Sequence, residues 1–127
     1  MMADPDLKGV RILVVEDEYL IADDLRDALL DASATVLGPV PTVSAAREII
    51  ESEPVIDAAL LDINLGGTLV FDIADDLAAR GVPIAFATGY DRWSIPERFA
   101  KVPRLEKPVR VRQVVTVLEM LMERQAS

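Results

Sequence analysis

The amino-acid sequence predicts an α/β domain in which a five-stranded parallel sheet is doubly wound, with helices on both faces. Two observations predict this class. Short apolar runs alternate with longer segments whose apolar residues recur every three or four positions, and this alternation occurs five times. The chain has 127 residues, of which 51% are hydrophobic, so it suits one domain with a substantial core. We therefore expect one domain over residues 1–127, with a flexible lead-in at 1–9 and a tail at 125–127.

The first half of the chain predicts three strands and two helices. Strands are expected at residues 11–15 and 35–40 and, in the centre of the sheet, at residues 56–61. The first helix starts near Tyr19, and its inward face holds Ile21, Leu25, Ala28, Leu29 and Ala32. The second helix is capped by Thr42 or Ser44 and ends near Ser52, with an inward face of Ala45, Ala46, Ile49 and Ile50.

The second half predicts two more strands and three helices, the middle one irregular. A helix over residues 68–79 buries Val70, Ile73, Ala74 and Leu77, and Gly81 is its C-cap glycine. Strands follow at residues 82–87 and 104–105. The two prolines between them leave only a short fourth helix near residues 95–100. The last helix spans residues 110–123, with a core face of Val111, Val114, Val115, Leu118, Leu121 and Met122; Val117 and Met120 fall outside that face.

The composition excludes several classes of function. The net charge of -9 argues against non-specific binding to nucleic acid or to an anionic membrane. The chain has no cysteine and no histidine, so it has no disulfide, no thiolate chemistry and no phosphohistidine of its own. It contains neither a leader pattern nor an apolar run long enough for a membrane span, so we expect a cytoplasmic protein.

Polar residues follow four of the predicted strands. Glu16 and Asp17 come after the first strand, Asp62 after the central one, Thr88 after the fourth and Lys107 after the last. Carboxyl ends of parallel strands meet at one rim, and carboxylates about 4 Å apart repel by roughly 4 kcal/mol per pair at an effective dielectric near 20. Lys107 and a hard divalent cation such as Mg²⁺ would neutralise them. A carboxylate nucleophile, a hydroxyl, an ammonium and this cation are what phosphoryl transfer onto Asp62 requires.

Each of these residues also has a simpler interpretation. Asp17 or Glu18 at a helix start is often a cap, Thr88 a turn hydroxyl, and Lys107-Pro108 a surface turn. Their shared position at strand ends favours the functional interpretation.

With these residues, the chain resembles a response-regulator receiver domain of two-component signalling over essentially its whole length. The motifs are residues 12–17 (Ile-Leu-Val-Val-Glu-Asp), 60–62 (Leu-Leu-Asp), 88–89 (Thr-Gly) and 107–108 (Lys-Pro). The resemblance implies a flavodoxin-like (βα)5 fold and a phosphoryl group accepted on Asp62 from a phosphohistidine of a sensor histidine kinase or phosphotransfer protein. It also implies a cis peptide before Pro108.

The resemblance assigns a role to each site residue. Asp17 and Asp62 would ligate Mg²⁺, Glu16 would act mainly through water, and the backbone carbonyl of Asn64 would complete the ligand set. Thr88 and Lys107 would each bind a phosphoryl oxygen. Such a protein is a phospho-acceptor that assists its own phosphorylation and dephosphorylation, and is not an enzyme acting on a separate substrate.

Phe86-Ala-Thr-Gly-Tyr90, preceded by Pro83, resembles the FAT GUY subgroup of receivers, whose kinases are often of the HWE or a related type. Most receivers have an aromatic residue three positions before the active-site lysine, where this chain has Arg104. The stretch between Thr88 and Lys107 is also shorter than usual. We therefore expect this loop itself to order or move when a phosphoryl group binds Thr88, with Trp93 as a reporter and Tyr90 tuning attack by water.

The expected protein is a stand-alone, monomeric response regulator that signals by protein contact, or acts as a phosphate sink or phosphorelay step. The alternatives are a receiver-like adaptor that is never phosphorylated and a receiver fragment of a larger regulator. A phosphatase of the haloacid-dehalogenase kind would carry its nucleophile on the first strand. A flavin-binding module would need a phosphate-binding loop where Glu16, Asp17 and Glu18 stand.

Overall fold

The centre of the structure is a parallel β-sheet of five strands. The computed structural model describes residues 7–89 and 95–126. The sheet order is β2-β1-β3-β6-β7, and every neighbouring pair is parallel. The strands are β1 (Arg11–Val15), β2 (Thr35–Val40), β3 (Ala58–Asp62), β6 (Ile84–Thr88) and β7 (Arg104–Glu106). The predicted five-stranded, doubly wound sheet is confirmed.

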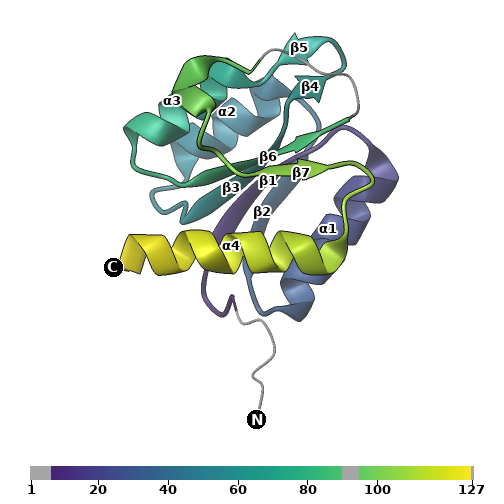
Figure 1. Cartoon of the computed structure of the whole chain (residues 1–127), viewed down its shortest axis with the longest axis vertical. Coiled ribbons are helices and arrows are strands. Elements are labelled where there is room, and N and C mark those ends of the chain that lie inside the picture. The colour runs from purple at the N-terminus through teal and green to yellow at the C-terminus, as the bar shows by residue number, and fades with distance from the viewer. Residues whose placement is uncertain (1–6, 90–94, 127) are drawn as a thin grey trace.

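Two pairs of helices cover the two faces of this sheet (Figure 1). On one face α1 (Tyr19–Asp31) lies beside α4 (Val111–Ala126), and on the other lie α2 (Val43–Ser52) and α3 (Phe71–Ala79). Each face has its own apolar core, and the inner strands β1, β3 and β6 are buried between the two cores; all five residues of β3 are buried. The predicted cap of α2 is confirmed, since the Thr42 hydroxyl accepts a hydrogen bond from Ala45 N at 3.0 Å.

The segment after Asp62 differs from the prediction. The helix expected from residue 68 begins only at Phe71, because a small antiparallel hairpin comes first, made of β4 (Asn64–Leu65) and β5 (Thr68–Leu69). Gly66 and Gly67 form its turn with φ values of +59° and +97°, which glycine adopts without strain. The hairpin places residues 64–67 beside the carboxyl end of β3.

The fourth crossover is short, as predicted. Its only described helical turn is the 3-10 helix η1 (Glu97–Phe99), shorter than the expected 95–100. Phe99 anchors this turn to the core. It stacks on Phe71 at 5.8 Å between ring centroids and meets Phe86 edge-on at 5.6 Å.

The described structure reaches into both terminal segments that the sequence assigned to a lead-in and a tail. Leu7, placed by the sequence in the lead-in, is 1% exposed, and its N–H donates to the carbonyl of Ala32. At the other end α4 continues through Ala126, into the predicted tail. Of the two apolar residues predicted to lie off the core face of this helix, Met120 is exposed, whereas Val117 is partly buried against the core. No helix in the described part of the chain is both long and apolar enough to cross a membrane.

Gly38 marks an irregularity in β2. The register between β1 and β2 shifts between Leu13 and Val15, and the Gly38–Pro39 peptide is cis. Gly38 has φ of +100°, and a Cβ atom there would lie 2.8 Å from Val40 N and 2.9 Å from Val14 O. Both the backbone conformation and the close approach therefore require glycine.

We expect Gly38→Ala to destabilise the fold more than Gly67→Ala does. The φ values of +100° and +97° are nearly the same, so both variants lose about 1–2 kcal/mol from backbone strain. A Cβ at Gly67 meets nothing within 4 Å, whereas one at Gly38 collides with backbone, which adds about 1–3 kcal/mol. Urea unfolding measures both free energies, and equal losses would contradict the packing argument.

Candidate functional site

The carboxyl ends of four strands bring the predicted polar residues together. Glu16 and Asp17 follow β1, Asp62 ends β3, Thr88 ends β6, and Lys107 follows β7. All of them except Glu16 line a pocket of about 270 Å³ at this rim of the sheet, and Glu16 pairs with Lys107 beside it. The lining residues are Asp17, Glu18, Asp62, Ile63, Asn64, Gly66, Thr88, Gly89 and Lys107.

Lys107 is the cation with which three of the acidic side chains pair. Its Nζ lies 3.0 Å from Asp62 Oδ2, 3.1 Å from Glu16 Oε1 and 3.1 Å from Glu18 Oε1. Burial disfavours the charged ammonium. The hydrogen bond to Asp62 and the negative charge of Glu16 outweigh burial, so the pKa of Lys107 is raised above its ordinary value. Lys107 is therefore held as a cation.

Glu16 is the buried carboxylate of the cluster with one oxygen that lacks a hydrogen bond. It is 3% exposed, and burial, together with the neighbouring Asp62 carboxylate, raises its pKa from 4.5 to about 8. Its Oε2 accepts hydrogen bonds from Glu18 N and Lys107. Its Oε1 lies close to Lys107 but has no hydrogen bond of good geometry. One lysine therefore does not fully satisfy this carboxylate.

The arrangement suits a hard divalent cation. One carboxylate oxygen from each of Glu16, Asp17 and Asp62 lies within 4.8 Å of the other two. Asp17 is exposed, which leaves room for the water ligands that Mg²⁺ keeps. The unsatisfied Glu16 Oε1 is an oxygen that such a cation, or a water bound to it, would satisfy. The residues present therefore fit a magnesium ion.

Asn64 and Thr88 line the pocket together with Asp62. The N–H of Asn64 donates to Asp62 Oδ1 at 3.2 Å, and the Asn64 side chain accepts from Gly67 N, which fixes the hairpin turn. The Thr88 hydroxyl donates to the carbonyl of Gly89 at 3.1 Å. The N–H of Lys107 donates to the Thr88 carbonyl at 2.8 Å, so the backbone links these two residues directly.

Glu18 belongs to the site, although the sequence suggested it only as a cap. It occupies the N-cap position of α1, but its side chain makes no capping hydrogen bond. The carboxylate instead pairs with Lys107, 89 residues further along the chain. The run of three acids at residues 16–18 was the signal in the sequence, because capping requires only one of them.

Three further predictions concern Tyr90 with Trp93, Arg104, and the peptide before Pro108. Tyr90 and Trp93 lie outside the described residues. Arg104 is exposed on β7, where it is paired in register with Phe86, so no aromatic side chain occupies this position. The Lys107–Pro108 peptide is cis, as predicted.

Solved structures with this architecture include several receiver domains. SdrG from Sphingomonas melonis Fr1 is 43% identical, with a TM-score of 0.79 over 90% of this chain and 97% of that one. A structure of the BeF3-activated conformation of SdrG is 41% identical, with a TM-score of 0.74 over 91% and 98% of the two chains. The signal receiver domain of a modulated diguanylate cyclase from Desulfovibrio desulfuricans G20 is 29% identical, with a TM-score of 0.76 over 94% and 98%. No protein-family model and no curated protein matches the chain.

The chain belongs to the response-regulator receiver domains. The response regulator receiver domain protein from Clostridium thermocellum shares the fold at 19% identity, with a TM-score of 0.77 over 92% of this chain and 97% of that one. The likeness of this receiver domain to SdrG extends over nearly the whole of both chains. The acidic rim and its lysine are therefore the candidate functional site of a receiver domain.

We expect the stability of the metal-free protein to fall as the pH rises from about 4.5 to about 8. Below pH 4.5 Glu16 is protonated in both the folded and the unfolded state. Above it the unfolded chain loses this proton while the folded protein keeps it, so the free energy of unfolding falls by up to about 1.4 kcal/mol per pH unit. Urea unfolding of the wild type and of Glu16→Gln, both in EDTA, isolates the contribution of Glu16 to the pH dependence. Parallel pH profiles for the two proteins would contradict it.

Proposed function

We propose that this receiver domain accepts a phosphoryl group on Asp62 and signals through the aspartyl phosphate. The observation that carries the proposal is the position of the Asp62 carboxylate. It is 5% exposed at the end of the central strand, it faces a pocket, and it lies 3.0 Å from the ammonium of Lys107. A carboxylate fixed in this way is a positioned nucleophile beside a cation that can neutralise charge on a phosphoryl group.

In the proposed step, one Asp62 oxygen attacks phosphorus. A P–O bond forms as the P–N bond to the donor imidazole breaks, and the leaving nitrogen keeps the bonding electron pair. Lys107 pairs with one phosphoryl oxygen. The Thr88 hydroxyl turns from the Gly89 carbonyl to donate to another. Loss of the phosphoryl group to water restores the Asp62 carboxylate.

Glu16, Asp17, Asp62 and the backbone carbonyl of Asn64 would hold Mg²⁺ at this site. The ion supplies positive charge that offsets the repulsion between the carboxylates and the incoming phosphoryl oxygens. The chain's own contribution is to hold three carboxylate oxygens within 4.8 Å of one another and to keep Lys107 protonated.

The phosphoryl donor must be another protein or a small molecule, because the chain contains no histidine. We infer a sensor histidine kinase, of the HWE or a related type, or a phosphotransfer protein. The Phe86-Ala-Thr-Gly-Tyr90 motif supports membership of the FAT GUY subgroup. The output would be a protein contact, a phosphate sink or a phosphorelay step made by a cytoplasmic monomer that acts as a stand-alone regulator.

We expect acetyl phosphate with Mg²⁺ to label the wild-type protein and not Asp62→Asn. The label should be acid-stable and released by hydroxylamine, as an acyl phosphate is, and EDTA should reduce it strongly. Asp72→Asn is the matched control, because Asp72 is exposed in the first turn of α3 and takes no part in the site. Phosphate-affinity electrophoresis and mass spectrometry measure the label. Failure of the wild type to acquire it would identify an adaptor.

We expect Mg²⁺ with beryllofluoride to change the fluorescence of Trp93, the single tryptophan of the chain. Beryllofluoride mimics the phosphoryl group on Asp62, and Thr88 lies five residues before the indole. Thr88→Ala should reduce the change, and Asp62→Asn should abolish it. An unchanged spectrum at saturating beryllofluoride would refute the proposed movement of the loop after Thr88.

A further inference from the structure

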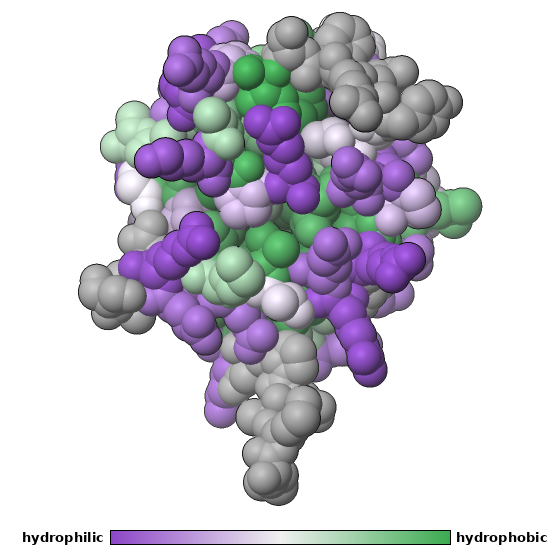
Figure 2. Space-filling view, in the orientation of Figure 1, coloured by the Kyte–Doolittle hydropathy of each residue, from purple (hydrophilic) through white to green (hydrophobic). Residues whose placement is uncertain are grey.

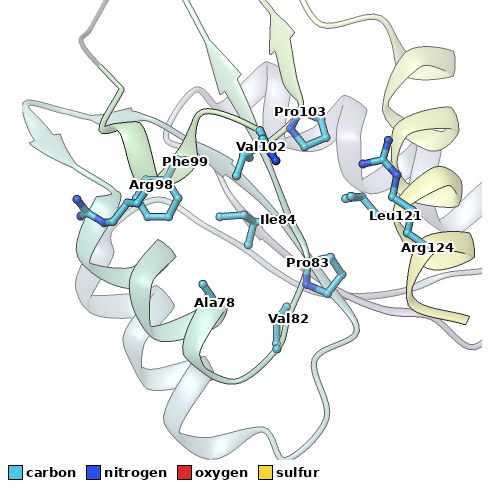
Figure 3. Close-up of a pocket in the computed structure, with 12 residues that line it drawn as sticks. Ala78, Val82, Pro83, Ile84, Arg98, Phe99, Val102, Pro103, Leu121 and Arg124 are labelled. Atoms are coloured by element: carbon cyan, nitrogen blue, oxygen red, sulfur yellow. The ribbon is translucent and has the colours of Figure 1, made fainter. Parts of the chain in front are cut away.

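A second pocket lies at the opposite end of β6 from the phospho-acceptor site. Its volume is about 370 Å³, and it lies among the end of α3, the start of β6, η1 and the end of α4 (Figure 3). Ile84 begins β6 and Thr88 ends it, so the two pockets are separated by about 13 Å along the strand.

The pocket has an apolar floor and lies beside the crossover from β6 to β7. The other crossovers in the sheet carry helices of 13, 10 and 9 residues, whereas the described part of this one has only the three residues of η1. The floor and walls include Ile84, Phe99, Val102 and Leu121 (Figure 3). Figure 2 shows hydrophobic surface between hydrophilic side chains on the face that carries α4.

The charge of the lining is opposite to that of the protein. The chain has 22 acidic and 13 basic residues, yet among its described residues the lining has three cations and no acid. Arg98 already forms a two-bond ion pair with Asp75. Lys101 and Arg124 are exposed and form no ion pair within residues 7–89 and 95–126. Arg98 and Arg124 lie on opposite sides of the apolar floor (Figure 3).

We propose that this pocket binds a short segment of a partner protein in which apolar anchor residues are flanked by acidic ones. The anchors would bury against Ile84, Phe99 and Val102, and the flanking carboxylates would pair with Lys101 and Arg124. The volume is near the lower end of the range of about 300–1,000 Å³ for binding pockets, so it fits a few side chains. A second copy of this acidic chain or an extended nucleic acid would meet repulsion from the net charge of -9.

The test is a titration of the full-length, isotope-labelled protein with the capped peptide Glu-Glu-Leu-Phe-Glu-Glu, followed by NMR. We expect saturable shifts of the Ile84, Val102 and Leu121 methyl groups that weaken in high salt. The peptides Lys-Lys-Leu-Phe-Lys-Lys and Glu-Glu-Gly-Ser-Glu-Glu, which lack the charge or the anchor, should not produce them. Asp62→Asn should bind like the wild type, which separates this site from phosphorylation.

Charge-reversal variants identify the cations that bind the peptide. Lys101→Glu and Arg124→Glu should each raise Kd by roughly threefold to tenfold. Arg112→Glu is the matched control, since it makes the same charge change near the start of the same helix as Arg124, away from the pocket. Absent or non-saturable shifts, equal binding of the lysine peptide, or an equal loss in Arg112→Glu would overturn the proposal. A dimer that Lys101→Glu dissociates would also overturn it, because the occupant would then be a second copy.

Discussion

The structure depends on a balance of charge at one rim of its sheet, where four carboxylates face a single ammonium. Glu16, Glu18 and Asp62 all pair with Lys107, and Asp17 lies beside them. Because Glu16 and Asp62 are buried, their repulsion is poorly screened by solvent. The raised pKa of Lys107 is a sign of this excess of negative charge, whereas that of Glu16 comes first from burial and then from the neighbouring Asp62 carboxylate. The site is therefore built to accept further positive charge.

The sheet topology brings these charged groups together at one rim. All five strands are parallel, so their carboxyl ends share one rim, and β3 lies in the middle with β1 and β6 on either side. Asp62 therefore receives neighbours from both directions. The opposite rim has no such acidic cluster among the residues described, and there the crossover from β6 to β7 lies beside a pocket whose charged lining residues are basic. The carboxyl end of β6 thus lies at a mainly acidic site, and its amino end lies at a pocket whose charged residues are basic.

The parts that the sequence predicted are those fixed by local pattern. The bounds of β1 were predicted as observed, and Asp62 was placed at the end of the central strand, because buried strands are continuous apolar runs. The hairpin at residues 64–69 was missed because its strands are two residues long, too short to show a period. The pairing of Glu18 with Lys107 joins side chains 89 residues apart, and no local pattern specifies it. Tyr90 and Trp93 remain predictions from sequence.

The distance along the chain between Glu16 and Lys107 sets a delay between the synthesis of the acidic residues and that of their lysine partner. These residues are 91 positions apart, and a ribosome adding about 5–20 residues per second needs roughly 5 to 20 s to reach the second after the first. During that interval the acids of the emerging polypeptide have no lysine partner at this rim. The pocket is finished only after Lys107 has been synthesised, so until then the nascent chain presents an acidic segment without its lysine.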